Sequence, residues 1–145
     1  MARGYASAIV DAAAGTVWAH IRDFGGLQNW NPGVAKSEVE DGKRGDQVGA
    51  IRSLNLANGK HVREQLLSHS DAERSFSYNF QKTHIDIDNY CATLRVSPVT
   101  DGDKSFVEWW ATFDCDRDKV DYWEKFWRDV FQQILGSLQA HFRGK

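Results

Sequence analysis

Residues 118–141 read DKVDYWEKFWRDVFQQILGSLQAH, and this stretch decides the fold. Apolar side chains recur in it every three or four residues, which is typical of an amphipathic helix. The apolar stripe consists of Val120, Trp123, Trp127, Val130, Ile134 and Leu138. Asp116 or Asp118 can cap the start of this helix with a side-chain oxygen. Since such a long helix must bury its apolar face, the residues before it have to supply a partner surface.

Alternation of apolar and polar residues predicts that this surface is a β-sheet. The expected strands are 5–10, 34–40, 48–56, 60–69, 74–81, 88–98 and 104–115. Before the last helix, helical spacing is confined to 13–24, where Gly25-Gly26 ends it. WNPG at 30–33 indicates a turn or a very short second helix. We therefore predict an α+β fold, with a curved antiparallel seven-stranded sheet wrapped around the C-terminal helix and two short helices after the first strand.

The hairpin around Asp101-Gly102 fixes the register of the last two strands, because this pair is typical of a two-residue type I′ turn. Arg95 then lies opposite Glu108, an opposite-charge pair that belongs on the outer face. The inward pairs in this register are Leu94 with Trp109, Ala92 with Ala111, and Tyr90 with Phe113. The two facing alanines either leave room for a cavity or accommodate the long helix.

The Asn-Gly pair at 58–59 marks another hairpin. A two-residue turn would mix polar and apolar side chains on each face, whereas a three-residue loop over 57–59 with a left-handed glycine separates them. The inward set is then Arg52, Leu54, Leu56, Val62, Glu64 and Leu66. This register places an arginine and a glutamate side by side on the inner wall.

Several short stretches also match a known superfamily in their order and spacing. They are TVW (16–18), DF (23–24), WNPG (30–33), GAIR (49–52), REQLL (63–67), SFSY (75–78), YCATLRV (90–96), VEW (107–109) and FD (113–114). Together they resemble the helix-grip superfamily that groups START lipid-transfer domains, birch-pollen-type allergens and bacterial polyketide cyclases (SRPBCC). The chain is most similar to the polyketide cyclase/dehydrase-like branch, and the resemblance extends over essentially its whole length.

The resemblance implies a hydrophobic cavity between the curved sheet and the last helix. The positions that it implies face this cavity are Arg52, Leu54, Leu56, Glu64, Tyr78, Tyr90, Trp109, Phe126, Val130 and Ile134, and the hairpin register adds Ala92 and Ala111. Glu64 beside Arg52 can orient a ligand or act as a general base, with Tyr90 and Arg52 polarising a carbonyl. The same two residues can instead be a buried ion pair that only stabilises the fold.

Composition limits the remaining possibilities. The chain has 145 residues, of which 41% are apolar and 26% charged, and its net charge is −2. This length predicts one domain over residues 1–145. The balanced charges argue against a nucleic-acid-binding stripe, and no apolar stretch reaches the roughly 18 residues of a membrane span. We therefore expect neither nucleic-acid nor integral membrane partners. With two Cys and no secretory h-region, we expect a cytoplasmic protein.

We expect no cofactor and no metal. The histidines are scattered without metal-ligand spacing, most of them as surface residues, and His84 falls in a loop that would border the cavity mouth. Three hypotheses follow. The first is binding of a small apolar or aromatic ligand of lipid, polyketide or phenolic type. The second is a cofactor-independent cyclase, dehydratase or aldol-type enzyme. The third is a partner-binding module that uses an exposed Trp110, which requires a filled interior. The sequence leaves the ligand and the oligomeric state open.

Overall fold

The computed structural model describes residues 1–143. Its helical elements are α1 (Ala14–Ile21), the 3-10 helices η1 (Phe24–Asn29), η2 (Glu40–Gly42) and η3 (Arg117–Lys119), and the long helix α2 (Val120–Phe142). The strands are β1 (Ala2–Val10), β2 (Val34–Val39), β3 (Ile51–Leu56), β4 (His61–Ser70), β5 (Ser75–Lys82), β6 (Asp88–Val99) and β7 (Lys104–Asp114).

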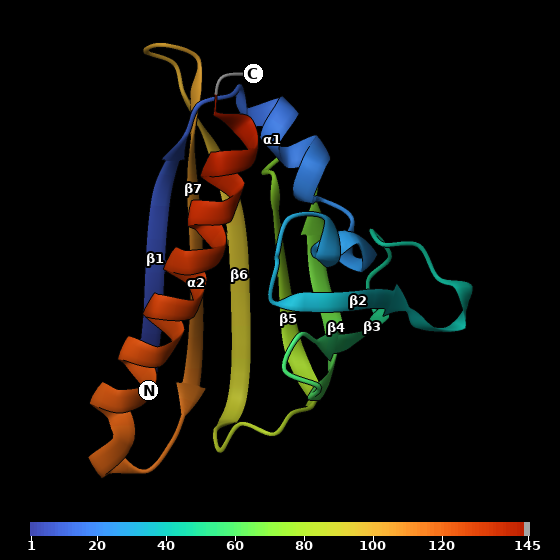
Figure 1. Ribbon diagram of the computed structural model, residues 1–145, viewed down its shortest axis with the longest axis vertical. Coiled ribbons are helices and arrows are strands. Elements are labelled where there is room, and N and C mark those ends of the chain that lie inside the picture. The colour runs from blue at the N-terminus through green and yellow to red at the C-terminus, as the bar shows by residue number, and fades with distance from the viewer. Residues whose placement is uncertain (144–145) are drawn as a thin grey trace.

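The strands form one antiparallel seven-stranded sheet in the order β1-β7-β6-β5-β4-β3-β2. Consecutive strands from β2 to β7 are neighbours, and β1 closes the other end by pairing with β7. Helix α2 runs lengthwise along β1, β7 and β6. The elements η1 and β2 lie at the other end of the strand order, in front of β4 and β5 in the view of Figure 1. This arrangement confirms the predicted α+β helix-grip fold.

Helix α2 also covers the free edge of β1. The side-chain amides of Gln132 and Gln139 donate to the backbone carbonyls of Ser7 at 3.2 Å and Ile9 at 2.9 Å. Only glycine fits at position 4, because a Cβ there would lie 2.6 Å from the Cβ of Trp127. The close approach of α2 therefore satisfies backbone groups that an edge strand would otherwise expose to other chains.

The predicted register of β3 and β4 at the inner wall is confirmed. Leu54 pairs with Val62 and Arg52 with Glu64, and the loop between the strands contains Gly59 at a φ of 86°. The left-handed region is open to glycine at little steric cost, so this residue sets the three-residue loop. The loop thereby fixes which side chains of β3 and β4 point inward.

The β6–β7 hairpin has the predicted register but not the predicted turn. Ala92 pairs with Ala111, yet the left-handed residues of the turn are Gly102 and Asp103, so it is not a type I′ turn at residues 101–102. The ladder also shifts between residues 88 and 91, where Asn89 has a φ of 53°, so Tyr90 is not paired with a residue of β7.

On the outer face of this hairpin, Arg95 and Glu108 are opposite each other in the ladder, but their side chains contact other residues. Arg95 lies opposite Glu108 as predicted. However, the Arg95 guanidinium contacts Glu73 at 3.3 Å, and Glu108 accepts the hydroxyl proton of Tyr5 at 2.6 Å. The predicted pairing of Arg95 with Glu108 is therefore confirmed, although each of the two side chains contacts another residue, because long side chains on a sheet can reach past their direct partners.

Two helix boundaries differ from the predictions. Helix α1 ends at Ile21, and Gly25-Gly26 lie inside η1 rather than ending α1. The reason is Asp23, which is extended and whose side chain accepts the backbone N–H of Gly25 at 3.0 Å, so that a new helix starts there. At α2, neither predicted aspartate caps the helix, because the 3-10 turn η3 precedes it and its N-cap residue, Lys119, makes no side-chain cap.

A polar cluster fastens the turn after β4 to α1. Asp71 accepts from the indole of Trp18 at 2.8 Å and from both Nε and Nη2 of Arg22 at 3.0 Å. The His69 ring nitrogen lies 3.1 Å from the same carboxylate, and its side chain is only 7% exposed, so His69 is an exception to the prediction that most histidines are surface residues. The hydrogen bonds from Arg22 and Trp18 hold the pKa of Asp71 far below its usual range.

We expect Asp71→Asn to reduce stability by about 1 kcal/mol at pH 7, because the Asp71 side chain is 59% exposed and water screens such pairs. A carboxylate whose pKa is lowered by folding stabilises the protein above its unfolded pKa, about 3.9, and loses this contribution as the pH falls. The difference from wild type should therefore narrow below about pH 4. Urea unfolding between pH 2.5 and 7 measures it, with Glu73→Gln as the surface control. If the stability difference between wild type and Asp71→Asn stays constant with pH, then the Asp71 carboxylate is not the source of the stabilisation.

Candidate functional site

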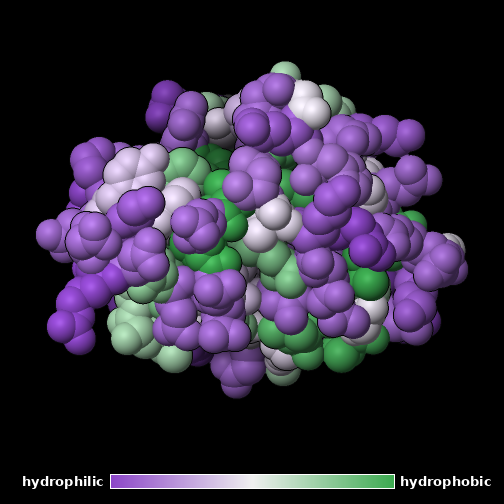
Figure 2. Space-filling view, turned by 90° about the horizontal axis from the view of Figure 1, so that it is seen from below, coloured by the Kyte–Doolittle hydropathy of each residue, from purple (hydrophilic) through white to green (hydrophobic). Residues whose placement is uncertain are grey.

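A cavity of about 210 Å³ lies between α2 and the concave face of the sheet. Aliphatic and aromatic side chains from η1, β2 to β7 and α2 form most of its wall. Exposed or half-buried residues at its rim are Asn58 from the β3–β4 loop, His84 and Ile85 from the β5–β6 loop, and Phe126 from α2. Figure 2 views the end of the molecule that carries the β5–β6 loop and shows hydrophobic side chains set back among hydrophilic ones. The interior is thus not completely filled, as the first two hypotheses require.

The charged part of the wall is a buried ion pair between neighbouring strands. Arg52 on β3 and Glu64 on β4 are direct register partners. Both Nε and Nη2 of Arg52 contact Oε1 of Glu64, at 2.8 and 2.7 Å. The side chain of Arg52 is 2% exposed and that of Glu64 is 7% exposed. Such short charge-assisted contacts hold both groups in one geometry.

The arginine is covered on every side. Its Nη1 donates to the backbone carbonyl of Phe24 at 3.1 Å. Its guanidinium carbon lies 3.9 Å from the ring centroid of Phe24 and 4.8 Å from that of Tyr78. Two aromatic faces and three engaged nitrogens stabilise a cation that would otherwise be costly to bury.

The glutamate is only half engaged. Both arginine contacts fall on Oε1, and Oε2 has no hydrogen-bond partner within residues 1–143. Burial raises the pKa of Glu64 above its usual value, and the charge and hydrogen bond of Arg52 oppose that rise. The two contacts below 3 Å to a cation favour the ionised form of this carboxylate. The cavity wall therefore presents one free acceptor atom of a charged group.

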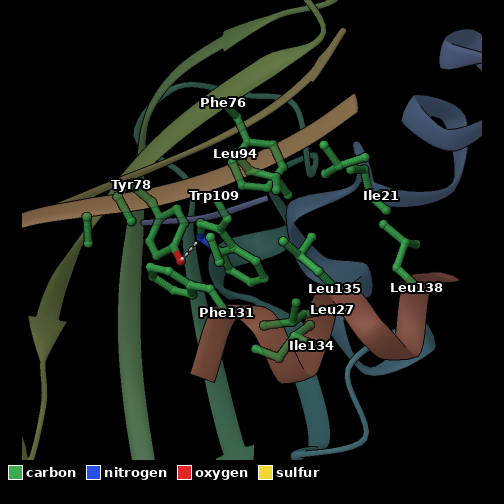
Figure 3. Packing of buried hydrophobic residues seen from close by; sticks show 14 of the residues in the cluster. Ile21, Leu27, Phe76, Tyr78, Leu94, Trp109, Phe131, Ile134, Leu135 and Leu138 are labelled. Carbon is green, nitrogen blue, oxygen red and sulfur yellow. Dashed lines mark hydrogen bonds between the residues drawn. The ribbon is translucent and has the colours of Figure 1, made fainter. Parts of the chain in front are cut away.

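Tyrosine hydroxyls lie next to this carboxylate. The indole Nε1 of Trp109 donates to the hydroxyl oxygen of Tyr78 at 3.1 Å, across β6, with Phe131 of α2 beside them (Figure 3). Burial raises the pKa of both Tyr78 and Tyr90, and the nearby Glu64 charge raises each further. Both phenols are therefore protonated near neutral pH and can offer hydrogen bonds.

The structure brings most of the sequence-predicted site residues together. Those that line the cavity are Arg52, Leu54, Leu56, Glu64, Tyr78, Tyr90, Trp109, Phe126, Val130 and Ile134. Ala92 and Ala111 do not line it, and both are completely buried. Because Ala92 is small, Tyr78 and Trp109 can meet over it and separate Ala92 from the cavity. The space predicted above these alanines is thus occupied by their neighbours.

Other lining residues were not among the positions predicted to line the cavity, although Val62 was predicted to point inward and His84 to lie in a loop at the cavity mouth. They are Leu27, Asn31, Val34, Asn58, Val62, Phe80, His84, Ile85, Trp127 and Phe131. Strand alternation could have found Phe80, two residues after Tyr78, and helical spacing could have found Phe131, four residues after Trp127. By contrast, Leu27 and Asn31 come from η1 and the turn after it, where no periodic pattern points inward. The pairing of Arg52 with the Phe24 carbonyl had no sequence signal either.

Two classes of feature are absent from the described part of the chain. Among residues 1–143, no three His, Cys, Asp or Glu residues gather as a metal site would require. Within the same residues, no helix has the length and apolar character needed to cross a membrane. Both cysteines, Cys91 and Cys115, are free thiols.

Comparisons with known proteins agree with this geometry. A family model described as "Polyketide cyclase / dehydrase and lipid transport" matches residues 1–143. The solved structure of XoxI from Bacillus cereus is 26% identical, with a TM-score of 0.89 over 99% of this chain and 97% of that one. A protein from Nitrosospira multiformis is 30% identical, with a TM-score of 0.81 over 98% and 97% of the two chains.

A more distant structure shows the fold alone. It is the di-domain ARO/CYC BexL from the BE-7585A biosynthetic pathway, which is 15% identical with a TM-score of 0.81. The alignment covers 97% of this chain and 46% of that one. No curated protein matches the sequence.

Proposed function

Because this chain belongs to the polyketide cyclase/dehydrase and lipid transport family, we propose that it binds a small apolar or aromatic molecule in the cavity between the sheet and α2. The observation that supports this proposal is a cavity of about 210 Å³ whose apolar wall carries one buried ion pair. An apolar cavity of roughly 150 Å³ is large enough to hold benzene. The ligand is therefore a small ring system or chain of lipid, polyketide or phenolic type.

A blocked cavity tests this proposal. Val130 is half-buried and lines the cavity, so in Val130→Trp the indole should occupy the ligand's space. With 2-naphthol as the probe, we expect calorimetric titration to show binding at least about tenfold weaker than wild type. Arg128→Trp adds the same side chain at an exposed position of α2 and should bind as wild type does. Equal binding by Val130→Trp would place the probe outside the cavity.

The half-engaged Glu64 favours a second candidate, an enzyme of the same fold. A carboxylate with a free oxygen in an apolar site can remove a proton from an acidic C–H, while Tyr90 and Arg52 polarise the adjacent carbonyl. Such a step would start an aldol-type cyclisation that ends with loss of water. Both candidates need the cavity, but only the second needs turnover.

Glu64→Gln separates the two candidates, because glutamine keeps the shape and removes the base. Heptane-2,4,6-trione is a suitable probe, since its aldol cyclisation and dehydration give orcinol. For an enzyme, we expect orcinol formation to fall by about 10²–10⁴-fold with probe binding retained. Glu38→Gln, at an exposed glutamate of β2, is the control. A wild-type protein that does not accelerate the reaction beyond buffer, or a variant as fast as wild type, contradicts Glu64 as its base.

A further inference from the structure

The ion pair in the cavity is oriented so that its two charges are not equally accessible. The cation of Arg52 is enclosed by Glu64, by the Phe24 carbonyl and by two aromatic rings, and its side chain is 2% exposed. The carboxylate turns one oxygen, Oε2, to no protein donor. A molecule in the cavity therefore meets a negatively charged acceptor and not the positive charge behind it.

From this arrangement we infer that the site selects uncharged ligands that carry a hydroxyl hydrogen-bond donor and rejects carboxylates of the same size. The donor would bind Oε2 of Glu64. A hydrogen bond to a charged group in an apolar cavity is among the stronger ones that a ligand can make. This inference rests on the proposed function and specifies the chemistry of its ligand.

A ligand carboxylate has two reasons to be excluded. Next to Oε2 it would place two like charges in a site of low dielectric, which is strongly unfavourable. It would also lose its hydration, and Arg52 cannot replace the water because its nitrogens already hold Glu64 and Phe24. A neutral hydroxyl carries neither cost.

The rim offers little compensation for an anion. His84 is the ionisable side chain among the rim residues, and burial together with the charge of Lys60 lowers its pKa, so it is largely neutral at pH 7. Cationic groups at this end are exposed lysines, Lys60 of the β3–β4 loop and Lys82 at the end of β5. An exposed lysine is well hydrated and gains little from pairing with an anion.

Three two-ring probes of nearly equal size test the inference by calorimetric titration at pH 7. They are naphthalene, 2-naphthol and 2-naphthoate. We expect 2-naphthol to bind at least about tenfold more tightly than 2-naphthoate, because one hydrogen bond to a charged group is worth about that factor. Naphthalene should lie between them. In Glu64→Gln the preference for the naphthol should shrink to within about threefold, since the amide can both donate and accept. The control Glu38→Gln should keep the wild-type preference.

The outcomes separate the inference from the proposed function. If 2-naphthoate binds as tightly as 2-naphthol, the inference is wrong while ligand binding in the cavity stands. If the preference survives in Glu64→Gln, Glu64 is not the acceptor and the inference is again wrong. If none of the three probes binds, the proposed function fails and the inference falls with it.

Discussion

Glu64→Leu should destabilise the protein by about 3–5 kcal/mol, because it removes one partner of a buried ion pair and leaves the other charge uncompensated. The guanidinium of Arg52 would keep the Phe24 carbonyl and two aromatic rings, but it would lose its only anion within residues 1–143. Urea unfolding at pH 7 measures the loss. We expect the midpoint to fall without a change in slope, since the unfolded surface is nearly unchanged.

The double variant Arg52→Met/Glu64→Leu distinguishes the cost of a lone charge from the value of the pair. Replacing both charges with apolar residues of similar size should return stability to within about 1 kcal/mol of wild type, because buried ion pairs roughly balance their own desolvation. Glu40→Leu is a matched control, since Glu40 and Arg63 make two contacts of 2.8 Å at the partly exposed outer surface. Glu40→Leu should lose much less stability than Glu64→Leu. If the double variant is as unstable as Glu64→Leu, then the pair contributes to the fold through more than charge compensation.

Trp127→Ala should cost about 3–5 kcal/mol, the range found when large aromatic residues are removed from cores. Trp127 is 7% exposed, and its ring centroid lies 4.9 Å from that of Tyr90 and 5.5 Å from that of Phe131. Because the side chain also lines the cavity, its removal would enlarge an existing void that apolar neighbours cannot refill.

Denaturant unfolding of Trp127→Ala is best compared with Trp110→Ala. Trp110 is half-buried on the outer face of the sheet, where it stacks on Tyr5 at 6.4 Å between ring centroids. We expect the smaller loss for Trp110→Ala, because that side chain leaves no internal void. A loss below about 1 kcal/mol for Trp127→Ala would mean that the side chain faces an open, hydrated cavity rather than packed core.

The inner wall could be predicted from sequence where local rules fix side-chain direction. The ion pair of Arg52 and Glu64 follows from the three-residue loop at Gly59, since strand alternation then leaves one choice of face. The lining residues on α2 follow from helical spacing in the same way. Family resemblance contributed the expectation of a cavity, which composition and periodicity do not reveal.

The remaining features depend on contacts between segments far apart in sequence. Tyr78 and Trp109 meet across an intervening strand, and this contact closes the space expected above Ala92. Asp23 starts a 3-10 helix that positions Phe24 over Arg52, although the glycines beyond it suggested the end of a helix. No local pattern encodes either event, because each depends on how the sheet curves around α2.

The pairing of β1 with β7 has a consequence for how the chain can fold. Ala2 pairs with Phe113, so the first strand finds its neighbour only after nearly all other strands have been synthesised, and its far edge is covered later still by α2. Contacts between such distant segments are slow to form, because a large loop must close before they contribute. β1 is synthesised before β7 and α2, so both of its edges stay unpaired until these two elements follow. Because α2 also supplies part of the cavity wall, that wall is complete only once α2 has been synthesised.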